Sequence, residues 1–316
     1  MPIIIGNIKP EDDYTHPLGS EQNFNESVYF NFFDRAQNRG GFVRLGNRAN
    51  EGYAEMTVIV YNADGSAFFN YKRPEILNND EWNAGGLKVE VLVAGEKLRT
   101  TYDGVAVYLK DPRAMSDPGK AFSENPIRHL KLDLVHHGVG PIYGHVGQSG
   151  DSNEFARAHY EQHMCVGGTL QFDDEQPIQF DGHGLRDHSW GPRYWQSVPS
   201  YRWITANYGD NLGMVISVIG GKPNGVLYDG DALYKIDAVD LQTDYEEGTK
   251  FHKALRAMIT LSDGETHDVV GTVKGFIPLR NRRGGATTYI GEGMTEYVLD
   301  GKHIGYGLSE YLDQPE

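Results

Sequence analysis

The segment Gly182–Trp195, with the sequence GHGLRDHSWGPRYW, holds the densest group of chemically capable side chains in the chain. Asp187 and His188 are adjacent, so a carboxylate and an imidazole offer a proton donor or acceptor and a partner that tunes it. Trp190 and Trp195 add electron-rich ring faces, which attract cations. The segment therefore predicts acid–base chemistry beside an aromatic wall. The alternative is a structural corner in which an aspartate pairs with an arginine and the tryptophans fill the core.

A second polar group lies upstream, at His159–His163, with the sequence HYEQH. On a helix, two histidines at this spacing would share one face, as in zinc enzymes. The HExxH motif, however, needs a glutamate directly after the first histidine, and this chain has Tyr160 there. On a strand, His159, Glu161 and His163 would share one face instead. We therefore expect no metal site, and Glu161 is a second candidate acid.

The fingerprints of common cofactors and nucleophiles are absent from the sequence. It contains no GxGxxG, no GxxxxGK[ST] and no GxSxG motif. Cys165 is the single cysteine and lies in an apolar context, which is typical of a small buried residue rather than a nucleophile. We expect no cofactor, so an enzyme with this sequence would work by acid–base chemistry alone.

Charge and hydropathy limit the partners and the location. The formal net charge of −15 disfavours binding to nucleic acid or to an anionic membrane surface. The densest basic group, Arg280–Arg283, is interpreted as a solvated loop in preference to an anion site. No apolar run approaches about 18 residues, and Met1–Ile5 lacks the basic start of a signal peptide. We expect a cytoplasmic protein with no integral membrane segment, and we leave its oligomeric state open.

The elements that must position these side chains are predicted to be strands. Glycine accounts for 39 of the 316 residues and aromatic residues for 11%, which favours turn-dense β structure. Period-two alternation recurs between turn signals, for example at Tyr53–Asn62 before Asp64-Gly65. Phe251–Ile259 also fits a helical stripe, but it leads directly into a hairpin turn, so a strand is favoured. Lys110–Pro126 and Gly138–Asn153 carry no periodicity and are expected to be irregular.

The segment Gly184–Gly191 resembles the Gly-x-x-Asp-His-x-Trp-Gly signature of the carotenoid 1,2-hydratase (hydroxyneurosporene synthase) superfamily. The strands that carry Gly291-Glu292-Gly293 and Gly305-Tyr306-Gly307-x-x-Glu310 resemble the closing strands of its members. The opening segment Phe24–Phe33 resembles a subgroup of unassigned function. The resemblance implies an all-β fold of two lipocalin-like antiparallel β-barrel or sandwich domains packed together, with an apolar pocket. We divide them into residues 1–184 and 185–316.

The resemblance also implies roles for particular residues. In the hydratases, the histidine and tryptophan of the signature are implicated in activity, together with a downstream Tyr-x-Asp. The first two correspond to His188 and Trp190. Tyr208-Gly209-Asp210 has the spacing of the third in what reads as a hairpin turn, and Tyr228-Asp229-Gly230-Asp231 is the other candidate, at a different spacing.

Two functions remain open. The first is a cofactor-independent hydratase, dehydratase, isomerase or cyclase that acts on a terpenoid or isoprenoid substrate. The second is a lipocalin-like carrier of a hydrophobic molecule without catalysis. Charged pairs retained inside the pocket would favour the enzyme, because a buried unpaired charge is costly. The predicted catalytic residues are Asp187, with His188 as its partner, Glu161, Tyr208 and Asp210; the predicted substrate-binding residues are His159, Tyr160, Arg186, Trp190, Trp195, Tyr201 and Trp203.

Overall fold

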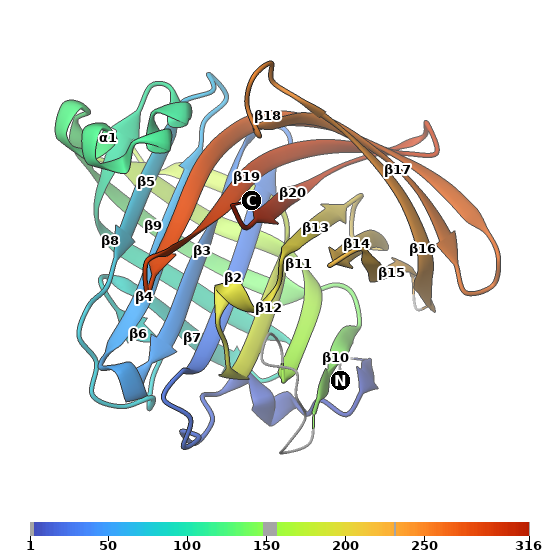
Figure 1. Cartoon of the computed structure of the whole chain (residues 1–316), viewed down its shortest axis with the longest axis horizontal. Coiled ribbons are helices and arrows are strands. Elements are labelled where there is room, and N and C mark those ends of the chain that lie inside the picture. The colour runs from blue at the N-terminus through green and yellow to red at the C-terminus, as the bar shows by residue number, and fades with distance from the viewer. Residues whose placement is uncertain (1–2, 148–156, 231, 316) are drawn as a thin grey trace.

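The computed structural model describes residues 3–147, 157–230 and 232–315, and most of their regular structure is antiparallel β strand (Figure 1). The strands form two sheets that follow one another along the chain. The first sheet consists of β1 (Ile4–Gly6), β2 (Phe24–Asp34), β3 (Arg39–Arg48), β4 (Tyr53–Tyr61), β5 (Ala67–Lys72), β6 (Asn83–Ala84), β7 (Leu87–Val93), β8 (Lys97–Leu109), β9 (Ile127–Gly138), β10 (Ile142–Val146), β11 (Ala158–Phe172) and β12 (Ile178–Pro192).

The first sheet curls back on itself. Its pairing order is β1-β10-β11-β12-β2-β3-β4-β5-β8-β7-β6, and β9 pairs with both β8 and β11. The strands β11, β12, β2, β3, β4, β5, β8 and β9 therefore form a closed circuit, which we call the first barrel. Only the short pairing of β1 with β10 is parallel among the described strand pairs.

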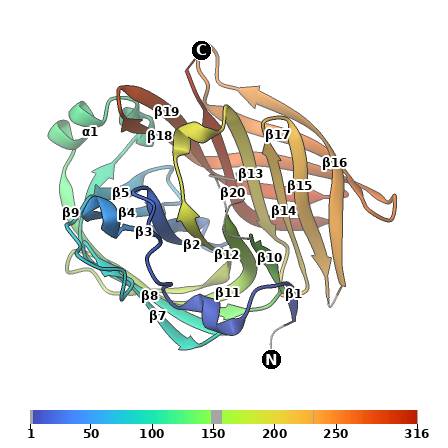
Figure 2. The same ribbon diagram turned by 60° about the horizontal axis from the view of Figure 1, so that its bottom comes forward.

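The second sheet is a closed barrel in which each strand pairs with the next and the last pairs with the first. It consists of β13 (Ser200–Asn207), β14 (Leu212–Ile219), β15 (Lys222–Asp229), β16 (Ala232–Tyr245), β17 (His252–Leu261), β18 (Thr266–Arg283), β19 (Ala286–Leu299) and β20 (His303–Asp313). Figure 2 shows the two units side by side, with β2, β12 and β20 at their junction. The predicted all-β class with two packed antiparallel units is confirmed.

Period-two alternation explains how one strand serves two cores. In β2, Val28, Phe30 and Phe32 belong to the apolar cluster inside the first barrel. Tyr29 and Phe33, on the other face of the same strand, belong to a cluster that also contains residues of the second barrel. Fully burying one large apolar side chain contributes roughly 1.5–3 kcal/mol. The alternating aromatic residues of β2 therefore stabilise the first barrel and its contact with the second barrel at once.

The short helices follow from local sequence. The 3₁₀ helices are η1 (Pro10–Asp13), η2 (Ala49–Glu51), η3 (Pro112–Ser116) and η4 (Trp195–Ser197), and the α-helix is α1 (Pro118–Glu124). η3 and α1 each begin with proline after an aspartate whose side chain accepts a backbone N–H bond, which is a favourable N-terminus. No helix in the described parts of the chain is both long and apolar enough to cross a membrane.

Several expectations about single segments can be compared with the structure. Phe251–Ile259 lies in strand β17 apart from its first residue, so the strand interpretation is confirmed. Lys110–Pro126 contains η3 and α1 where no periodicity was visible. Gly138–Asn153 contains β10, and its part from residue 148 onward lies outside the described residues.

The change from one sheet to the other falls in a short connection. Strand β12 crosses the expected boundary at residues 184 and 185 and pairs along its length with β11 and β2 of the first sheet. The second barrel begins at Ser200, after η4. We therefore propose that the two domains meet between Pro192 and Ser200.

Candidate active site

Strands β11 and β12 carry both sequence motifs, and their side chains alternate between two environments. The two strands pair from Ala158 opposite Trp190 to Leu170 opposite Ile178 without a register shift. The chain bend that would bring Asp187 and His188 into one pocket is absent. Gly184 instead permits close strand packing, because a Cβ there would lie 1.9 Å from the carbonyl oxygen of Asn31. Asp187 faces the second barrel, whereas His188 faces the interior of the first.

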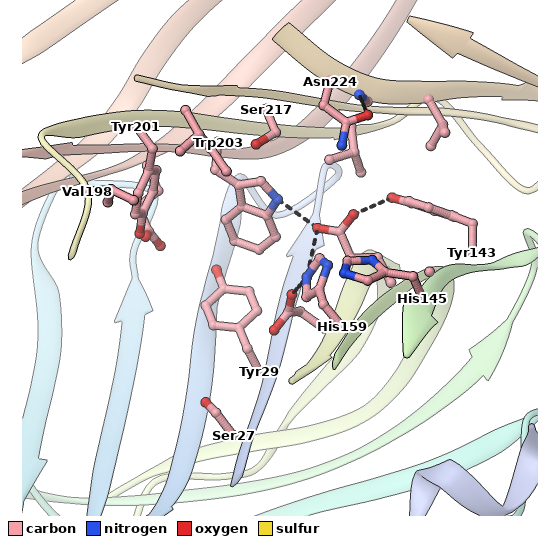
Figure 3. A pocket seen from close by; sticks show the side chains of 18 of the residues that line it. Ser27, Tyr29, Tyr143, His145, His159, Val198, Tyr201, Trp203, Ser217 and Asn224 are labelled. Atoms are coloured by element: carbon pink, nitrogen blue, oxygen red, sulfur yellow. Dashed lines mark hydrogen bonds and ion pairs between the residues drawn. The ribbon is translucent and has the colours of Figure 1, made fainter. Parts of the chain in front are cut away.

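A cavity of about 400 Å³ lies between the two barrels, and we call it the inter-barrel cavity. His159, Glu161 and Asp187 line it from the first barrel (Figure 3). Tyr201 and Trp203 line it from the second barrel, on β13. Of the predicted residues, the cavity thus brings together His159, Glu161, Asp187, Trp195, Tyr201 and Trp203.

Strand register arranges the polar lining as two rows. In the first barrel, directly opposed positions on β10, β11, β12, β2 and β3 give the row Tyr143, Glu161, Asp187, Tyr29 and Arg44. In the second barrel, opposed positions on β14, β13, β20 and β19 give the row Ser217, Trp203, Glu310 and Glu292. Directly opposed residues project to the same face of a sheet, so each row presents a line of polar groups to the space between the barrels.

Hydrogen bonds join the centre of this lining into one group. Nε2 of His159 bonds to the carboxylate of Asp187, and it also lies 3.9 Å from Oε1 of Glu161. The Tyr143 hydroxyl donates to Oε2 of Glu161 at 2.7 Å, and Nε1 of Trp203 donates to Oε1 at 2.7 Å. In Figure 3 the dashed lines from the labelled Tyr143 and Trp203 meet at one carboxylate, which is that of Glu161. The arrangement links both barrels through one carboxyl group.

The pKa values within this group diverge. Burial alone would raise the pKa of Asp187, but the charge and hydrogen bond of His159 outweigh it and hold that pKa below its usual value. Burial alone would lower the pKa of His159, but the two carboxylates raise it to about 9. Burial raises the pKa of Glu161, and the charge of Asp187 adds to that shift against the opposing effect of His159. An ion pair thus stands beside a carboxyl group whose pKa is raised, and such a divergence of pKa values is the separation that acid–base catalysis uses.

Two further carboxyl groups at this interface escaped the sequence reasoning about function. Burial raises the pKa of Glu310 to about 7 and that of Glu292 to about 8, against the opposing charge of nearby arginines. Both residues are buried, and they are directly opposed on β20 and β19. The sequence did contain one indication of Glu292: this glutamate stands at an alternate position between two apolar residues, Ile290 and Met294, where an apolar side chain would be expected. Tyr29, Arg44 and Tyr143 carried no such signal, because only register brings them to the cavity.

Arginine side chains cover Trp195, one of the aromatic residues that line the inter-barrel cavity. The guanidinium groups of Arg44 and Arg193 lie over the Trp195 ring, at 5.4 and 4.7 Å from its centroid. The cation-attracting surface of Trp195 is therefore already in use. Trp203 contacts Tyr29 edge to face, with ring centroids 5.2 Å apart. It presents its indole N–H to Glu161.

Comparison with known protein families shows the family to which the chain belongs. A family model described as "Domain of unknown function (DUF7064)" matches residues 9–315. The chain belongs to the DUF7064 family. A search of curated protein sequences found no match.

Solved structures share the fold of this DUF7064 chain at low sequence identity. A protein from Nitrosomonas europaea described as an AttH matches with a TM-score of 0.57 and 16% identity, covering 95% of this chain and 98% of that one. CghA matches with a TM-score of 0.54 and 12% identity, covering 95% and 93%. Kievitone hydratase from Nectria haematococca has a TM-score of 0.49 and 13% identity, covering 99% and 98%. At these identities the likeness to the first two shows the fold alone.

The signature histidine of the DUF7064 chain lies in a second polar cluster, inside the first barrel. Nε2 of His188 lies 2.9 Å from Oε1 of Glu26, and Nδ1 of His16 lies 2.6 Å from the same oxygen. The Trp190 ring stacks on His16 with centroids 3.9 Å apart. Burial alone would raise the pKa of Glu26, but the two histidines lower it to about 2. This cluster ties the N-terminal segment to the barrel interior.

Arg186 and Tyr160 also point into the first barrel. Arg186 pairs with Asp13, and its Nε donates to Oε1 of Gln162 at 2.9 Å. The Tyr160 hydroxyl donates to Asp13 at 2.5 Å. The structural alternative stated for the signature is met in part: Arg186 does pair with an aspartate, but that aspartate is Asp13 from outside the motif, and Trp190 is only partly buried.

The remaining predicted residues lie away from the inter-barrel cavity. Asp210 is exposed in the turn after β13 and accepts a bond from Nε2 of His183 at 2.7 Å. Tyr208 is largely buried beside Gly305 of β20, and burial raises its pKa. Tyr228 bonds to the backbone of the same turn.

Two groups in the described parts of the chain could hold a metal ion by the nature of their donor atoms. In each group the donor atoms, which are histidine nitrogens and carboxylate oxygens, lie within 4.8 Å of one another. One group lies on each face of β11 and β12. Such mixed donors suit Zn²⁺. Both groups are already joined internally by hydrogen bonds and ion pairs. The groups are His159, Glu161 and Asp187, and His16, Glu26 and His188.

Proposed function

We propose that the protein is a cofactor-independent acid–base enzyme, a hydratase, dehydratase, isomerase or cyclase. Its substrate would be a hydrophobic, terpenoid-like molecule bound between the two barrels. The observation that carries this proposal is the hydrogen-bonded group of a buried Glu161 with the partly buried His159 and Asp187 in the lining of the inter-barrel cavity. The resemblance of Gly184–Gly191 to the hydratase signature is its support in the sequence.

The group supplies the parts that such a reaction needs. Glu161, whose pKa is raised by burial, is the proposed proton donor. The Asp187–His159 pair is the proposed acceptor and directs water or the substrate proton. Positioned acid–base groups contribute typically 10²–10⁴-fold, or about 3–5 kcal/mol. Even the smallest typical enzymatic rate enhancement lowers the activation barrier by roughly 8 kcal/mol. Exclusion of water and orientation of the substrate between the barrels must supply the rest of that reduction. We propose a structural role for His188, because it is buried inside the first barrel with Glu26.

Charge inside the cavity favours an enzyme over a carrier. A pocket that only carries an apolar ligand needs no ionised group, and burying one is costly. Here a histidine and an aspartate form an ion pair in the lining, with side chains 29% and 15% exposed. Two arginines and three glutamates lie in or beside the same lining.

Turnover in deuterated water tests the proposal. Purified, metal-stripped protein would be incubated with terpenoid alkenes, tertiary alcohols and enones, and products would be identified by mass spectrometry. We expect protein-dependent deuterium at carbon or a mass change equal to water. Glu161→Gln and Asp187→Asn should each lower the rate at least 100-fold, because each removes a proton-transfer group.

A distant pair of the same chemistry provides the control. Asp103 and His129 form an exposed contact of 2.8 Å on the first barrel. Asp103→Asn should leave turnover unchanged. Compounds that bind without any change would refute the enzyme and support the carrier. Full turnover by both Glu161→Gln and Asp187→Asn would refute the assigned residues.

A further inference from the structure

A second chamber adjoins the inter-barrel cavity. It has a volume of about 440 Å³ and shares four lining residues with the cavity. The shared residues are Tyr29, Arg44, Trp195 and Glu310, and we call them the partition. A molecule too long for either space alone would cross the partition.

Beyond the partition, one wall of the second chamber is apolar, and another carries charged side chains, among them Glu55, Arg73, Arg280 and Arg282. Met115 of η3 and Phe122 of α1 line it on one side, so the irregular segment after β8 forms part of its wall. Strands of both barrels supply the rest of this apolar wall, with Phe42, Phe69, Leu279 and Ile290. Such a wall suits the hydrocarbon body of a ligand.

Three polar atoms at or beside the partition lack a hydrogen-bond partner within the described protein. They are the Tyr29 hydroxyl, Nη2 of Arg44 and Oε2 of Glu292, and all three residues line the second chamber. The Asn31 side chain lies near Tyr29 and bonds to Thr205 and Leu185, but its geometry to the Tyr29 hydroxyl does not make a hydrogen bond. Buried polar groups in native proteins are nearly always paired, so three orphans around one space call for an explanation.

The three orphans share one chemistry. A tyrosine hydroxyl and a guanidinium donate hydrogen bonds, and a guanidinium has no acceptor. Burial raises the pKa of Glu292 to about 8, so at neutral pH this group is a carboxylic acid and also donates. Three donors from residues that line one chamber match a group that only accepts.

We propose that the partition binds a carbonyl or carboxylate oxygen of an apolar substrate, whose hydrocarbon body lies in the second chamber. This inference rests on the proposed function and deepens it, since it names a group that the substrate carries. A pure hydrocarbon would leave all three donors unpaired and would bind less well.

A sesquiterpenoid series tests this inference without turnover. Farnesene, farnesal and farnesoic acid share one carbon chain and differ in the terminal group. Binding would be measured by calorimetry and by quenching of tryptophan fluorescence, because Trp195 and Trp203 line the cavity. We expect farnesal or farnesoic acid to bind at least tenfold more tightly than farnesene at pH 7. Comparing these two ligands separates a carbonyl from a carboxylate as the preferred group.

Tyr29→Phe and Tyr61→Phe form a matched pair of variants. Both residues are buried tyrosines of the first barrel, but the Tyr61 hydroxyl already donates to the carbonyl oxygen of Glu292 at 3.0 Å. Tyr29→Phe should reduce the preference for the oxygenated ligand several-fold and leave farnesene binding and the melting temperature unchanged or higher. Tyr61→Phe should lower the melting temperature and keep the preference.

The outcomes distinguish this inference from the proposed function. Equal affinity for farnesene and both oxygenated compounds would overturn it, as would an unchanged preference in a folded Tyr29→Phe variant. Tight, selective binding without any turnover would uphold the partition site while refuting the enzyme. Turnover of hydrocarbons with no preference for oxygenated compounds would uphold the enzyme and refute the partition site.

Discussion

At the scale of single residues, the charges around the inter-barrel cavity favour a reaction in which negative charge develops. Arg44 and Arg193 are guanidinium groups, and the pKa of His159 is raised to about 9, so all three are positive at neutral pH. The raised pKa values of Glu292 and Glu310 remove part of the opposing charge. Fixed positive groups stabilise an oxyanion or enolate. The Trp195 ring, which could otherwise stabilise a cation, is covered by arginines.

The glutamate inside the first barrel should make the protein sensitive to acid. The pKa of Glu26 is about 2 in the fold against 4.5 when unfolded, so its stabilising contribution is present above pH 4.5 and is lost as pH falls towards 2. The loss by pH 3 should be about 2 kcal/mol in the free energy of unfolding. Urea unfolding of wild type and Glu26→Gln at pH 7 and pH 3 measures it. A wild type that loses no more stability than the variant would contradict the assigned ion pairs.

At the scale of strands, register decides which residues meet, and register was the part that the sequence predicted least well. Alternation correctly predicted a strand at Tyr53–Asn62, and it predicted that His159, Glu161 and His163 would share a face on a strand. Nothing in it shows that Asp187 lies opposite both Glu161 and Tyr29, or that Glu310 lies opposite both Trp203 and Glu292. Those pairings join segments far apart in the chain. The signature motif therefore identified β12 but not which of its two faces lines the cavity.

Glycine at position 184 should be essential to the packing of β12 against β2. A Cβ at Gly184 would meet backbone atoms of β2 at 1.9 Å, and backbone cannot move aside as a flexible side chain can. Gly184→Ala should destabilise the protein by roughly 3 kcal/mol, more than ordinary overpacking tends to cost. Gly167→Ala on β11 is the control, because its nearest atom would lie at 3.9 Å. Thermal and urea unfolding would compare the two, and equal losses would refute the close approach as the cause.

At the scale of the whole molecule, the catalytic proposal requires the two barrels to behave as one body. The acid group belongs to the first barrel, while Trp203 and Glu310 belong to the second. The sequence predicted two packed units, but not that the space between them, rather than the interior of either barrel, would hold the polar site. The apolar cluster that joins them combines Tyr29, Phe42 and Ile59 with Ile277, Met294 and Leu308.

This shared cluster predicts that the barrels unfold together. Leu308 is fully buried in the cluster although it belongs to the second barrel. Leu308→Ala should cost about 2–5 kcal/mol by leaving a cavity at the junction. Because both barrels depend on that junction, a single transition should be seen by circular dichroism and tryptophan fluorescence, displaced equally in the variant. Leu255→Ala is the matched control, because Leu255 is buried in the core of the second barrel and is not part of the cluster at the junction. Two separate transitions, with only one shifted by Leu308→Ala, would show that the barrels are independent and that the cavity between them is not held rigid enough to orient a substrate.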